Sequence, residues 1–433
     1  MSDEPPLGRA RRALRVELRD RVRHVLRRIF WTLPAPLRGA LNAPRHWLAR
    51  ALRRRSAGGP HHGAELSFAE FSALHLGVAA GARPVVIFEL NLDWCMPQPQ
   101  RPHHLARALG RAGCLVIYRT FAHEATGWRE VEGNVWLCGD EEVARIPGAV
   151  RCFFSTSLVA RARDLAAAGD YGRVVYDYID RIDAAISGGA AAARRLHGLR
   201  QAAFAGGADV IVASARVLYD EALAACGEAR CAYVANGVDV AHYRARGDQR
   251  VLPALRDLRR QGRPIVGYFG AIAPWLWFEA MDGLAARMPD TVFVYVGPDY
   301  GGCVPRLPRR GNVLYVGALN YDELPAHAGL FDVCMIPFRL GDIAKATSPL
   351  KLYEYFALEK PVVVTADLTE CLGYRGVFVG QDVETLESAI RRALEASRDE
   401  TLREALRQQA DFNSWDARAV AWMERVMQPG EDT

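Results

Sequence analysis

The lysines of this chain are confined to one short stretch. Lys345, Lys351 and Lys360 all fall within IAKATSPLKLYEYFALEKPVVVT, residues 343–365, whereas the other 52 basic side chains are arginine. An ammonium group is compact and flexible, and it meets a phosphate as a point charge where arginine presents a planar fork. The stretch is therefore the first candidate for a nucleotide or phosphate site, with compositional drift as the competing interpretation.

The segment TSPLKLYEYFALEKP predicts where the lysine-bearing helix begins. Ser348 is a good N-cap and Pro349 a favoured first helical residue. The free N–H groups of Leu350 and Lys351 would then point out of the helix end and attract an anion. Glu354 lies one turn deeper on the face of Lys351, where a carboxylate can accept hydrogen bonds from ribose hydroxyls. The alternative is a surface Lys–Glu pair on an ordinary helix.

Beyond this helix, short apolar runs alternate with helical segments along the chain. Such alternation predicts parallel sheets covered by helices on both faces. Strands are expected at 85–90, 115–119, 134–138, 151–155, 173–179, 209–214 and 231–235, and then at 264–270, 291–297, 312–317, 332–338, 361–365 and 377–380. A polar, arginine-rich segment at 244–263 separates the two series.

The predicted fold class is α/β, with two doubly wound, Rossmann-like domains that face a central cleft. We expect an arginine-rich arm at 1–57, an N-terminal domain at 58–245, a C-terminal domain at 246–400, and C-terminal helices at 401–433 that pack back across the cleft. In such sheets ligands lie outside the carboxyl ends of the strands, so the cleft is the expected binding site.

Composition excludes several classes of protein. The chain of 433 residues is half hydrophobic and 24% charged, a balance typical of a globular protein with more than one core. Its nine cysteines form no CxxC pair and lie mostly in apolar runs, which predicts buried thiols in a reducing cytosol. Because it has neither a long apolar run nor a secretory signal pattern, we expect a cytoplasmic protein.

The amino-terminal arm has a different character. Residues 1–55 carry fifteen arginines against four acidic residues, beside Leu14, Leu18, Val22, Val25 and Ile29 at helical spacing. A basic amphipathic helix of this kind suits an anionic bilayer, so we predict that residues 1–57 hold the protein peripherally at the inner face of the cytoplasmic membrane. Docking to an acidic protein partner and a solvated tail are the competing interpretations. No nucleic-acid-binding signature accompanies the arginines.

The second half of the chain resembles a known family. NVLYVGALNYDELPAHAGLFDVCMIPF (312–338) and ATSPLKLYEYFALEKPVVVT (346–365) are similar to the donor half of GT-B-fold glycosyltransferases, in the broad group 1 family that builds bacterial polysaccharides. GYFGAIAPWLWFE (267–279), ANGVDVAHY (235–243) and NSWDARAVAWMERV (413–426) resemble further segments of that family. The similarity begins at about residue 84 and is weaker in the first domain.

This resemblance implies a nucleotide-sugar site in the second domain. Gly270 and Ala271 would face the sugar diphosphate, and Gly317, Ala318 and Leu319 would run along the base. Thr347, Ser348, Leu350 and Lys351 would hold the diphosphate, and Glu354 the ribose. The chain departs from the family at Ala346, where retaining members commonly carry a glutamate that helps to hold the donor sugar. The donor sugar and the stereochemistry of transfer therefore stay open.

The first domain would bind the acceptor. The loop after its first strand offers Asp93, Trp94, Gln100, Arg101 and His103 as groups that could grip a sugar or a pyrophosphate-linked lipid, although Trp94 and the histidines could equally pack at the entry to a helix.

An inverting transfer also needs a carboxylate base, and YDYIDRID (176–183) offers Asp180, with Asp177 second. A helix cap or a buried structural carboxylate is the alternative for each, and a retaining reaction would need no such base. No D-x-D triplet occurs, so we expect neither a metal nor another cofactor, and Lys351 with the helix N-terminus would meet the charge of the leaving group.

The function predicted from the sequence is transfer of a sugar from a nucleotide-diphosphate sugar to a polysaccharide or lipid-linked acceptor. A sugar-nucleotide epimerase on the same fold and a non-catalytic nucleotide-sugar-binding scaffold are the alternatives.

Overall fold

The structure, a computed structural model of the chain, describes residues 65–77, 83–92, 94, 96, 98–120, 127–139, 141–169, 172–245 and 251–428. The arm predicted at residues 1–57 lies outside these ranges. Within them, no helix is both long and apolar enough to cross a membrane. All eight described cysteines are free thiols, and each except Cys226 is buried.

The first domain is built on a largely parallel sheet, which has eight strands in the described residues. These are β1 (Val85–Asn91), β2 (Leu115–Thr120), β3 (Arg129–Glu132), β4 (Val135–Cys138), β5 (Val150–Phe154), β6 (Val174–Tyr178), β7 (Val210–Ala213) and β8 (Cys231–Tyr233), in the order β3-β4-β2-β1-β5-β6-β7-β8. Only the edge strand β3 runs antiparallel to its neighbour. The helices are α3 (Phe68–His75), α4 (Arg101–Arg111), α5 (Ala162–Gly169), α6 (Ala190–Ala202), α7 (Arg216–Cys226) and α8 (Val240–Arg244).

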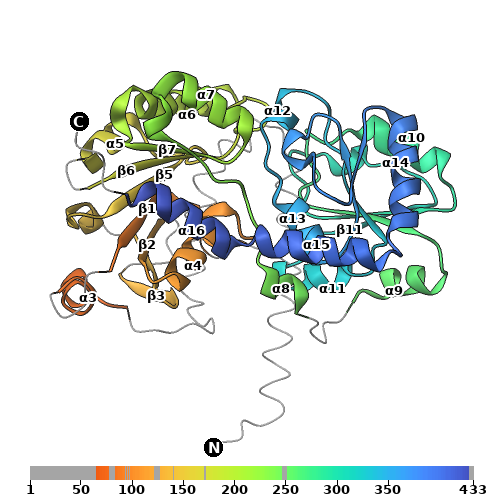
Figure 1. Cartoon of the computed structure of the whole chain (residues 1–433), viewed down its shortest axis with the longest axis horizontal. Helices are drawn as coiled ribbons and strands as arrows, with labels where there is room; N and C mark the ends of the chain where they lie inside the picture. The colour runs from red at the N-terminus through yellow and green to blue at the C-terminus, as the bar shows by residue number, and fades with distance from the viewer. Residues whose placement is uncertain are drawn as a thin grey trace, which may run out of the picture. The chain divides into compact units, whose positions relative to one another are not determined.

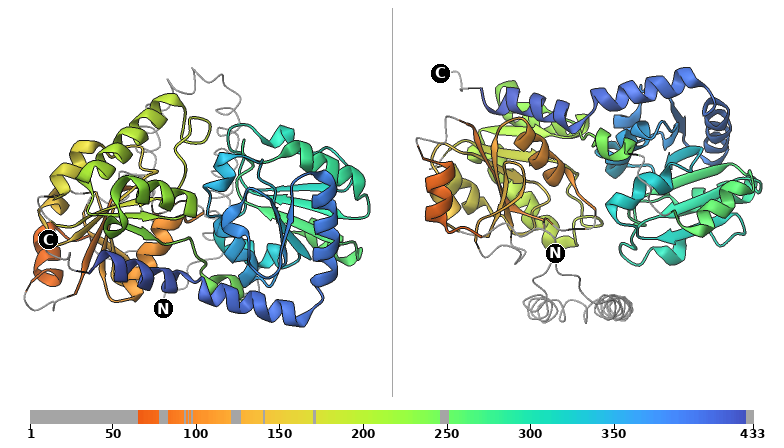
Figure 2. Two further views of the ribbon diagram at one scale, coloured as in Figure 1. Left: turned by 45° about the horizontal axis from the view of Figure 1, so that its top comes forward. Right: turned by 90° about the horizontal axis from the view of Figure 1, so that it is seen from below.

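The second domain has a fully parallel sheet in the order β11-β10-β9-β12-β13-β14. Its strands are β9 (Ile265–Phe269), β10 (Val292–Val296), β11 (Val313–Gly317), β12 (Val333–Ile336), β13 (Val362–Thr365) and β14 (Val377–Gly380). Its helices are α9 (Pro253–Arg260), α10 (Phe278–Arg287), α11 (Leu324–Ala328), α12 (Asp342–Lys345), α13 (Leu350–Ala357), α14 (Val383–Ala396) and α15 (Glu400–Phe412). Helices flank both sheets in the two views of Figure 2.

Burial explains why these runs become strands. Every residue of β6, β9 and β10 is buried, as expected for parallel strands covered on both faces. The predicted α/β class with two doubly wound domains is therefore confirmed. The sequence interpretation missed β3, whose alternating exposure marks an edge strand, and α9, which lies in the segment predicted to be a linker.

The chain ends in two helices that cross from one domain to the other. Within the C-terminal helical region expected at 401–433, the helix is interrupted at Asn413, and Ser414 caps α16 (Trp415–Val426) by accepting a hydrogen bond from the N–H of Ala417. In Figure 1, α15 and α16 follow one another across both sheets. Trp415 and Trp422 of α16 belong to the apolar core of the first domain.

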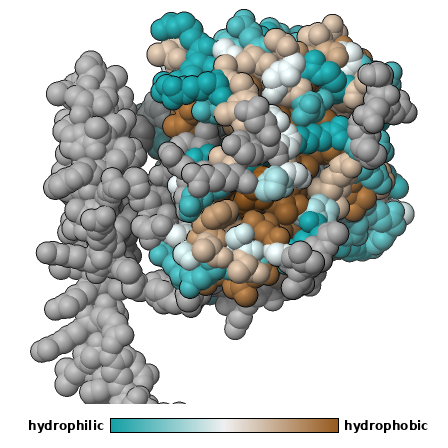
Figure 3. All heavy atoms as spheres, turned by 90° about the vertical axis from the view of Figure 1, so that its left-hand side faces the viewer, coloured by the Kyte–Doolittle hydropathy of each residue, from teal (hydrophilic) through white to brown (hydrophobic). Residues whose placement is uncertain are grey.

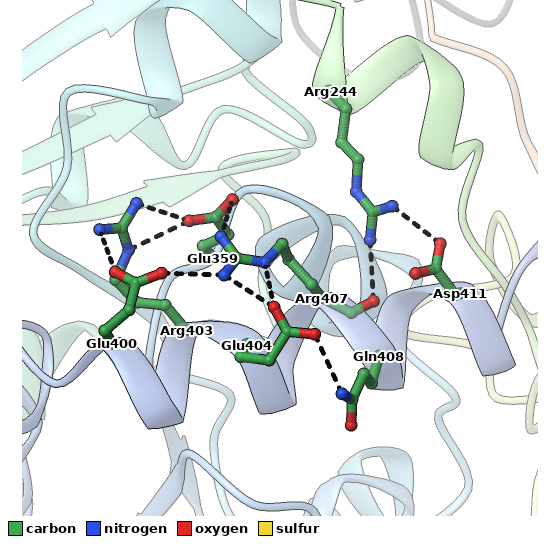
Figure 4. A network of polar contacts seen from close by, with 8 residues as sticks. All are labelled: Arg244, Glu359, Glu400, Arg403, Glu404, Arg407, Gln408 and Asp411. Atoms are coloured by element: carbon green, nitrogen blue, oxygen red, sulfur yellow. Dashed lines mark hydrogen bonds and ion pairs between the residues drawn. The ribbon is translucent and has the colours of Figure 1, made fainter.

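A network of ion pairs holds α15 to the second domain (Figure 4). Arg403 and Arg407 both pair with Glu359, at 2.6 and 3.0 Å. Arg244, at the end of α8, pairs with Asp411 at 2.8 Å. These pairs are partly exposed, so their contribution is one of orientation more than of stability.

A buried chain of polar groups joins the two domains. The Arg101 guanidinium donates to both carboxylate oxygens of Asp177, at 2.9 and 3.2 Å, and to the side-chain oxygen of Asn236 at 3.2 Å. Asn236 in turn donates through its backbone N–H to the Ser348 hydroxyl and through its amide to the Ser348 carbonyl, at 3.2 and 2.6 Å. Ser348 precedes α13, so the first domain positions the start of that helix.

The surface of the first domain carries some apolar side chains. On the face shown in Figure 3, apolar residues gather in the middle and hydrophilic ones surround them. Leu74 of α3 is 61% exposed, and Leu158 and Val159 are also exposed. Folded proteins carry such surface routinely, so it does not by itself indicate a binding site.

The buried pair of Arg101 and Asp177 generates the first prediction. Asp177→Asn should lower the free energy of unfolding by about 3–5 kcal/mol, because it leaves a buried guanidinium without its counter-charge. Asp416→Asn removes an exposed pair with Arg111 and should cost less than about 1 kcal/mol. Chemical denaturation measures both, and equal stability of the two variants would contradict the structural role given to Asp177.

Candidate functional site

A cavity of about 290 Å³ lies between the two domains and is lined by both. In the second sheet the strand order reverses between β9 and β12, and the residues that follow these strands, Trp275 and Phe338, line the cavity. In the first sheet the reversal falls between β1 and β5, and Leu92 and Thr156 line it there. The cavity therefore occupies the switch point of each sheet, where doubly wound domains bind ligands.

The lysine-bearing helix begins one residue later than predicted. Helix α13 starts at Leu350, and Pro349, not Ser348, is its N-cap. The Ser348 hydroxyl accepts a hydrogen bond from Asn236 instead, so it is not available to cap the helix. Among the described residues, the N–H groups of Leu350 and Lys351 have no protein acceptor, and both residues line the cavity. The predicted helix end with free N–H groups is thus present, without the serine cap, and its binding of an anion stays a prediction.

Lys351 lies at the centre of this site. Its ammonium is 5.6 Å from the ring centres of Tyr268 and Phe338. Within the described ranges it has no ion pair, and burial lowers its pKa while Glu354 and Asp180 oppose that shift. An ammonium that is desolvated and unpaired is poised to receive an anion.

The floor beside Lys351 is formed by glycines at the carboxyl ends of neighbouring strands. Gly270 has a φ of 140° and Gly297 a φ of 148°. A Cβ at Gly270 would lie 2.6 Å from Cε of Lys351, and one at Gly297 would lie 1.9 Å from the Gly270 carbonyl oxygen. The Gly297 N–H donates to the Gly317 carbonyl at 2.8 Å. Glycine at position 270 thus admits the Lys351 side chain, and glycine at position 297 admits the backbone of Gly270.

The other donor residues predicted in the second domain lie around this row. The Ala271 carbonyl accepts the Tyr268 hydroxyl at 3.0 Å. Ala318 is exposed, whereas Leu319 packs against the core of the second domain. The Thr347 hydroxyl lines the cavity but donates to the Ile343 carbonyl at 2.6 Å.

Glu354 is buried one turn below Lys351, with only 8% of its surface exposed. Burial raises its pKa to about 7, although Lys351 and the Tyr243 hydroxyl favour its charged form. The Tyr321 ring is stacked on His242, with centres 3.9 Å apart. The contact of Glu354 to ribose hydroxyls stays a prediction, and Glu354 does not line the cavity.

The two carboxylates considered as base differ in their surroundings. Asp177 is fully buried and held by Arg101, so its assignment as second base is corrected: both its oxygens are engaged by protein and it does not line the cavity. Asp180 follows β6 and does line the cavity. Burial raises its pKa to about 6, opposed by Arg101 and Lys351. Asp183 accepts from the N–H of Ala185 and caps a turn.

The acceptor-binding prediction needs larger corrections. Asp93 lies outside the described residues. His103 is fully buried and accepts from the N–H of Gln100 at 3.1 Å, so it closes the start of α4. Trp94 packs on His103 and does not line the cavity. Arg101 borders the cavity, but its guanidinium is bound to Asp177, Ala235 and Asn236. Gln100 also lines the cavity, and its side-chain amide donates to the Gln98 carbonyl in its own loop.

Sequence reasoning missed several residues that build the site. In the sequence, Asn236 stands out only as part of the family-like segment 235–243, and Gly297 only as the end of the strand expected at 291–297. Phe338 and Trp275 also follow strands, so the rule that ligands lie at carboxyl ends could have found them. Ala346, at the position of the absent glutamate, is fully buried and packs with core residues of the first domain.

The described residues contain no group of three or more potential metal-ligating side chains.

Comparison with known proteins agrees with this architecture. Residues 263–396 match the family model described as "Glycosyl transferases group 1". A Bacillus subtilis protein provisionally named as the teichuronic acid biosynthesis glycosyltransferase TuaH is 30% identical over 220 residues, 48% of this chain and 54% of that protein. The match thus spans about half of the length of that relative.

Two solved structures share the fold. Sucrose-phosphate synthase of Thermosynechococcus elongatus superposes with a TM-score of 0.57 at 15% identity, covering 79% of this chain and 98% of that one. HepE of Anabaena, in complex with UDP and glucose, superposes with a TM-score of 0.54 at 15% identity, covering 80% and 100%. At this identity the likeness shows the fold alone. The chain therefore has the GT-B fold, and its residues 263–396 are similar to the group 1 glycosyltransferases.

Proposed function

We propose that the protein transfers a glycosyl group from a uridine-diphosphate sugar to a saccharide or lipid-linked saccharide during polysaccharide synthesis at the cytoplasmic membrane face. The observation that carries the proposal is that a free ammonium and a carboxylate with a raised pKa, Lys351 and Asp180, line one cavity from opposite domains. The family match supports glycosyl transfer over an epimerase or a scaffold.

The donor would bind on the second domain. The diphosphate would lie against Lys351 and the free N–H groups at the start of α13, which supply positive charge without a metal ion. The glycine row at Gly270, Gly297 and Gly317 would admit the backbone of the nucleotide, and Glu354 would accept hydrogen bonds from its ribose. Uridine is proposed because HepE, which shares the fold, was solved with UDP.

The acceptor would enter from the first domain, where Asp180 would be the base. The acceptor hydroxyl attacks the anomeric carbon and its proton passes to the Asp180 carboxylate. The bond between the anomeric carbon and the diphosphate oxygen breaks, and the electron pair leaves with the nucleoside diphosphate. This route inverts the anomeric configuration. Lys351 would stabilise the charge that develops on the leaving diphosphate.

The link to polysaccharide synthesis and to the membrane has separate support. The Bacillus subtilis relative is named for teichuronic acid biosynthesis, which makes a saccharide polymer the natural acceptor class. The arginine-rich composition of residues 1–57 supports attachment to an anionic membrane surface.

Lys351→Ala should lower kcat/KM by about 10- to 1,000-fold while the thermal unfolding temperature stays close to that of the parent. The loss follows because Lys351 and Arg101 are the cations among the described residues that line the cavity, and Arg101 is already paired with Asp177. Lys345→Ala is the matched control, since Lys345 faces Asp367 at 4.0 Å and does not line the cavity. Release of UDP from UDP-sugars, assayed in the presence of EDTA, measures both variants. Parental kinetics in Lys351→Ala would remove the proposed diphosphate contact.

The pH dependence of kcat/KM should report the ionisation of the Asp180 carboxyl. A base must be deprotonated to act, so kcat/KM should rise with pH through the Asp180 pKa of about 6. Asp180→Asn should lower kcat by about 10²- to 10⁴-fold. Because burial raises the pKa of Glu354 to about 7, the pH profile is also measured in Glu354→Gln, where the rise through the Asp180 pKa must persist. An active Asp180→Asn enzyme, or a product that retains the anomeric configuration, would exclude Asp180 as the base.

The membrane proposal is tested by flotation with vesicles that contain anionic lipid. The full chain should float with these vesicles at low salt and less at high salt, because attraction of arginines to the lipid surface is screened. Vesicles of neutral lipid are the control. A chain without residues 1–57 that floats equally well would show that the arm is not the anchor.

A further inference from the structure

Resting on the proposed transfer to a lipid-linked acceptor, we propose that the first domain itself docks on an anionic lipid surface, through a patch that is separate from the arm and adjoins the acceptor side of the cavity. We call it the β5–α6 patch. It comes from the loop after β5, the start of α5, and α6, and its members are Leu158, Val159, Arg161, Arg163, Arg194 and Arg195.

The apolar part of the β5–α6 patch is presented by a short turn. The Ser157 hydroxyl accepts a hydrogen bond from the N–H of Ala160 at 3.3 Å, and Leu158 and Val159 are the two residues between them. Ser157 and Ala160 are buried, whereas Leu158 and Val159 are 47% and 43% exposed. The turn therefore holds two aliphatic side chains in water, and their transfer into an apolar layer would be favourable.

The basic part of the patch lies beside this turn. All four of its arginines are exposed, and α5 and α6 lie side by side in Figure 1. The Arg195 guanidinium donates to the Leu158 carbonyl, which joins α6 to the turn. Asp164 of α5 is paired with Arg163 at 3.8 Å, and the sequence has no acidic residue from 184 to 208. The patch thus has a net positive charge, which complements an anionic lipid surface.

The combination of the two parts favours lipid over a soluble partner. Arginines alone would suit a nucleic acid or an acidic protein as well as a membrane. Against a purely polar partner, Leu158 and Val159 would have no apolar surroundings to enter. At a membrane interface, aliphatic side chains enter the boundary of the acyl chains while guanidinium groups stay with the lipid phosphates. An anionic lipid surface therefore satisfies both parts of the patch.

The patch adjoins the cavity on the side proposed for the acceptor. Thr156 lines the cavity, and Leu158 lies two residues farther along the chain, a span of at most about 7 Å. Leu92 also lines the cavity and is 37% exposed, and it follows β1, the neighbour of β5 in the sheet. Interfacial segments bury their apolar side chains to a depth of about 5–10 Å. Insertion of the turn would therefore bring Thr156 close to the lipid head groups, where a lipid-linked saccharide is attached.

Titration of the full chain with vesicles tests the patch. Vesicles of equal parts phosphatidylglycerol and phosphatidylcholine supply the anionic surface. Arg161→Glu combined with Arg194→Glu should lower the partition constant by about 10-fold or more, because each arginine near such a surface adds to the attraction. Leu158→Ser combined with Val159→Ser should lower it by about 5-fold or more, because the apolar contact is lost. All four side chains are exposed, so the thermal unfolding temperature should stay that of the parent.

Matched variants elsewhere control for charge and for apolar surface. Arg309→Glu combined with Arg398→Glu makes the same change in charge at exposed positions of the second domain. Leu74→Ser removes a leucine of α3 that is 61% exposed. Each control should change the partition constant by less than about 2-fold, because charges beyond a Debye length from the lipid are screened. Unaltered vesicle binding in both patch variants, or an equal loss in the controls, would overturn the proposal.

Release of UDP from UDP-sugars without vesicles separates this proposal from the proposed function. The patch variants should keep the parental rate, because no patch residue lines the cavity. If the parent itself releases no UDP, the proposed glycosyl transfer fails, and the vesicle titration decides the patch on its own. If the arginine variant keeps its vesicle binding but is retained less by heparin, the arginines bind a soluble polyanion and the lipid proposal is wrong.

Discussion

Four polar side chains, none more than 3% exposed, join the domains beneath the cavity: Asp177, Arg101, Asn236 and Ser348. Each would be costly to bury alone, and together they satisfy one another, so the contact holds as a unit. Its ends lie at the carboxyl end of β6 and at the start of α13. Asp180 follows the first and Lys351 the second, so the buried chain sets how these two side chains, which both line the cavity, are placed relative to each other.

Lys351, Asp180 and Glu354 are ionisable groups that lose hydration because they are buried at or near the cavity. Burial lowers the pKa of Lys351 and raises those of Asp180 and Glu354, and each group partly offsets the others. An empty site with unpaired charges costs stability, and a bound diphosphate would relieve that cost by meeting the ammonium. The same desolvation raises the pKa of Asp180 to about 6. A carboxylate with this pKa is a stronger base than one in water, yet it is still ionised at neutral pH.

Prediction from sequence succeeded where the signal was local. Apolar runs located every described strand of both sheets except β3, and Lys351 was singled out by composition and helix-end chemistry alone. Prediction from sequence failed where the role of a side chain depends on which residues, distant in the sequence, it contacts in the fold. Asp177 and Asp180 looked alike in YDYID, but one meets Arg101 and the other faces the cavity. His103 and Arg101 followed a strand as ligands do, yet both are used to build α4 and its contacts.

The sequence by itself determined the α/β alternation, the two-domain organisation and the helix that carries Lys351, because period, propensity and capping act over a few residues. Tertiary structure alone decided that Ser348 binds Asn236 rather than capping α13, and that Asp177 is held by Arg101 while Asp180 lines the cavity. These outcomes depend on groups more than 70 residues apart, such as Arg101 and Asp177, whose proximity exists only after both sheets have formed.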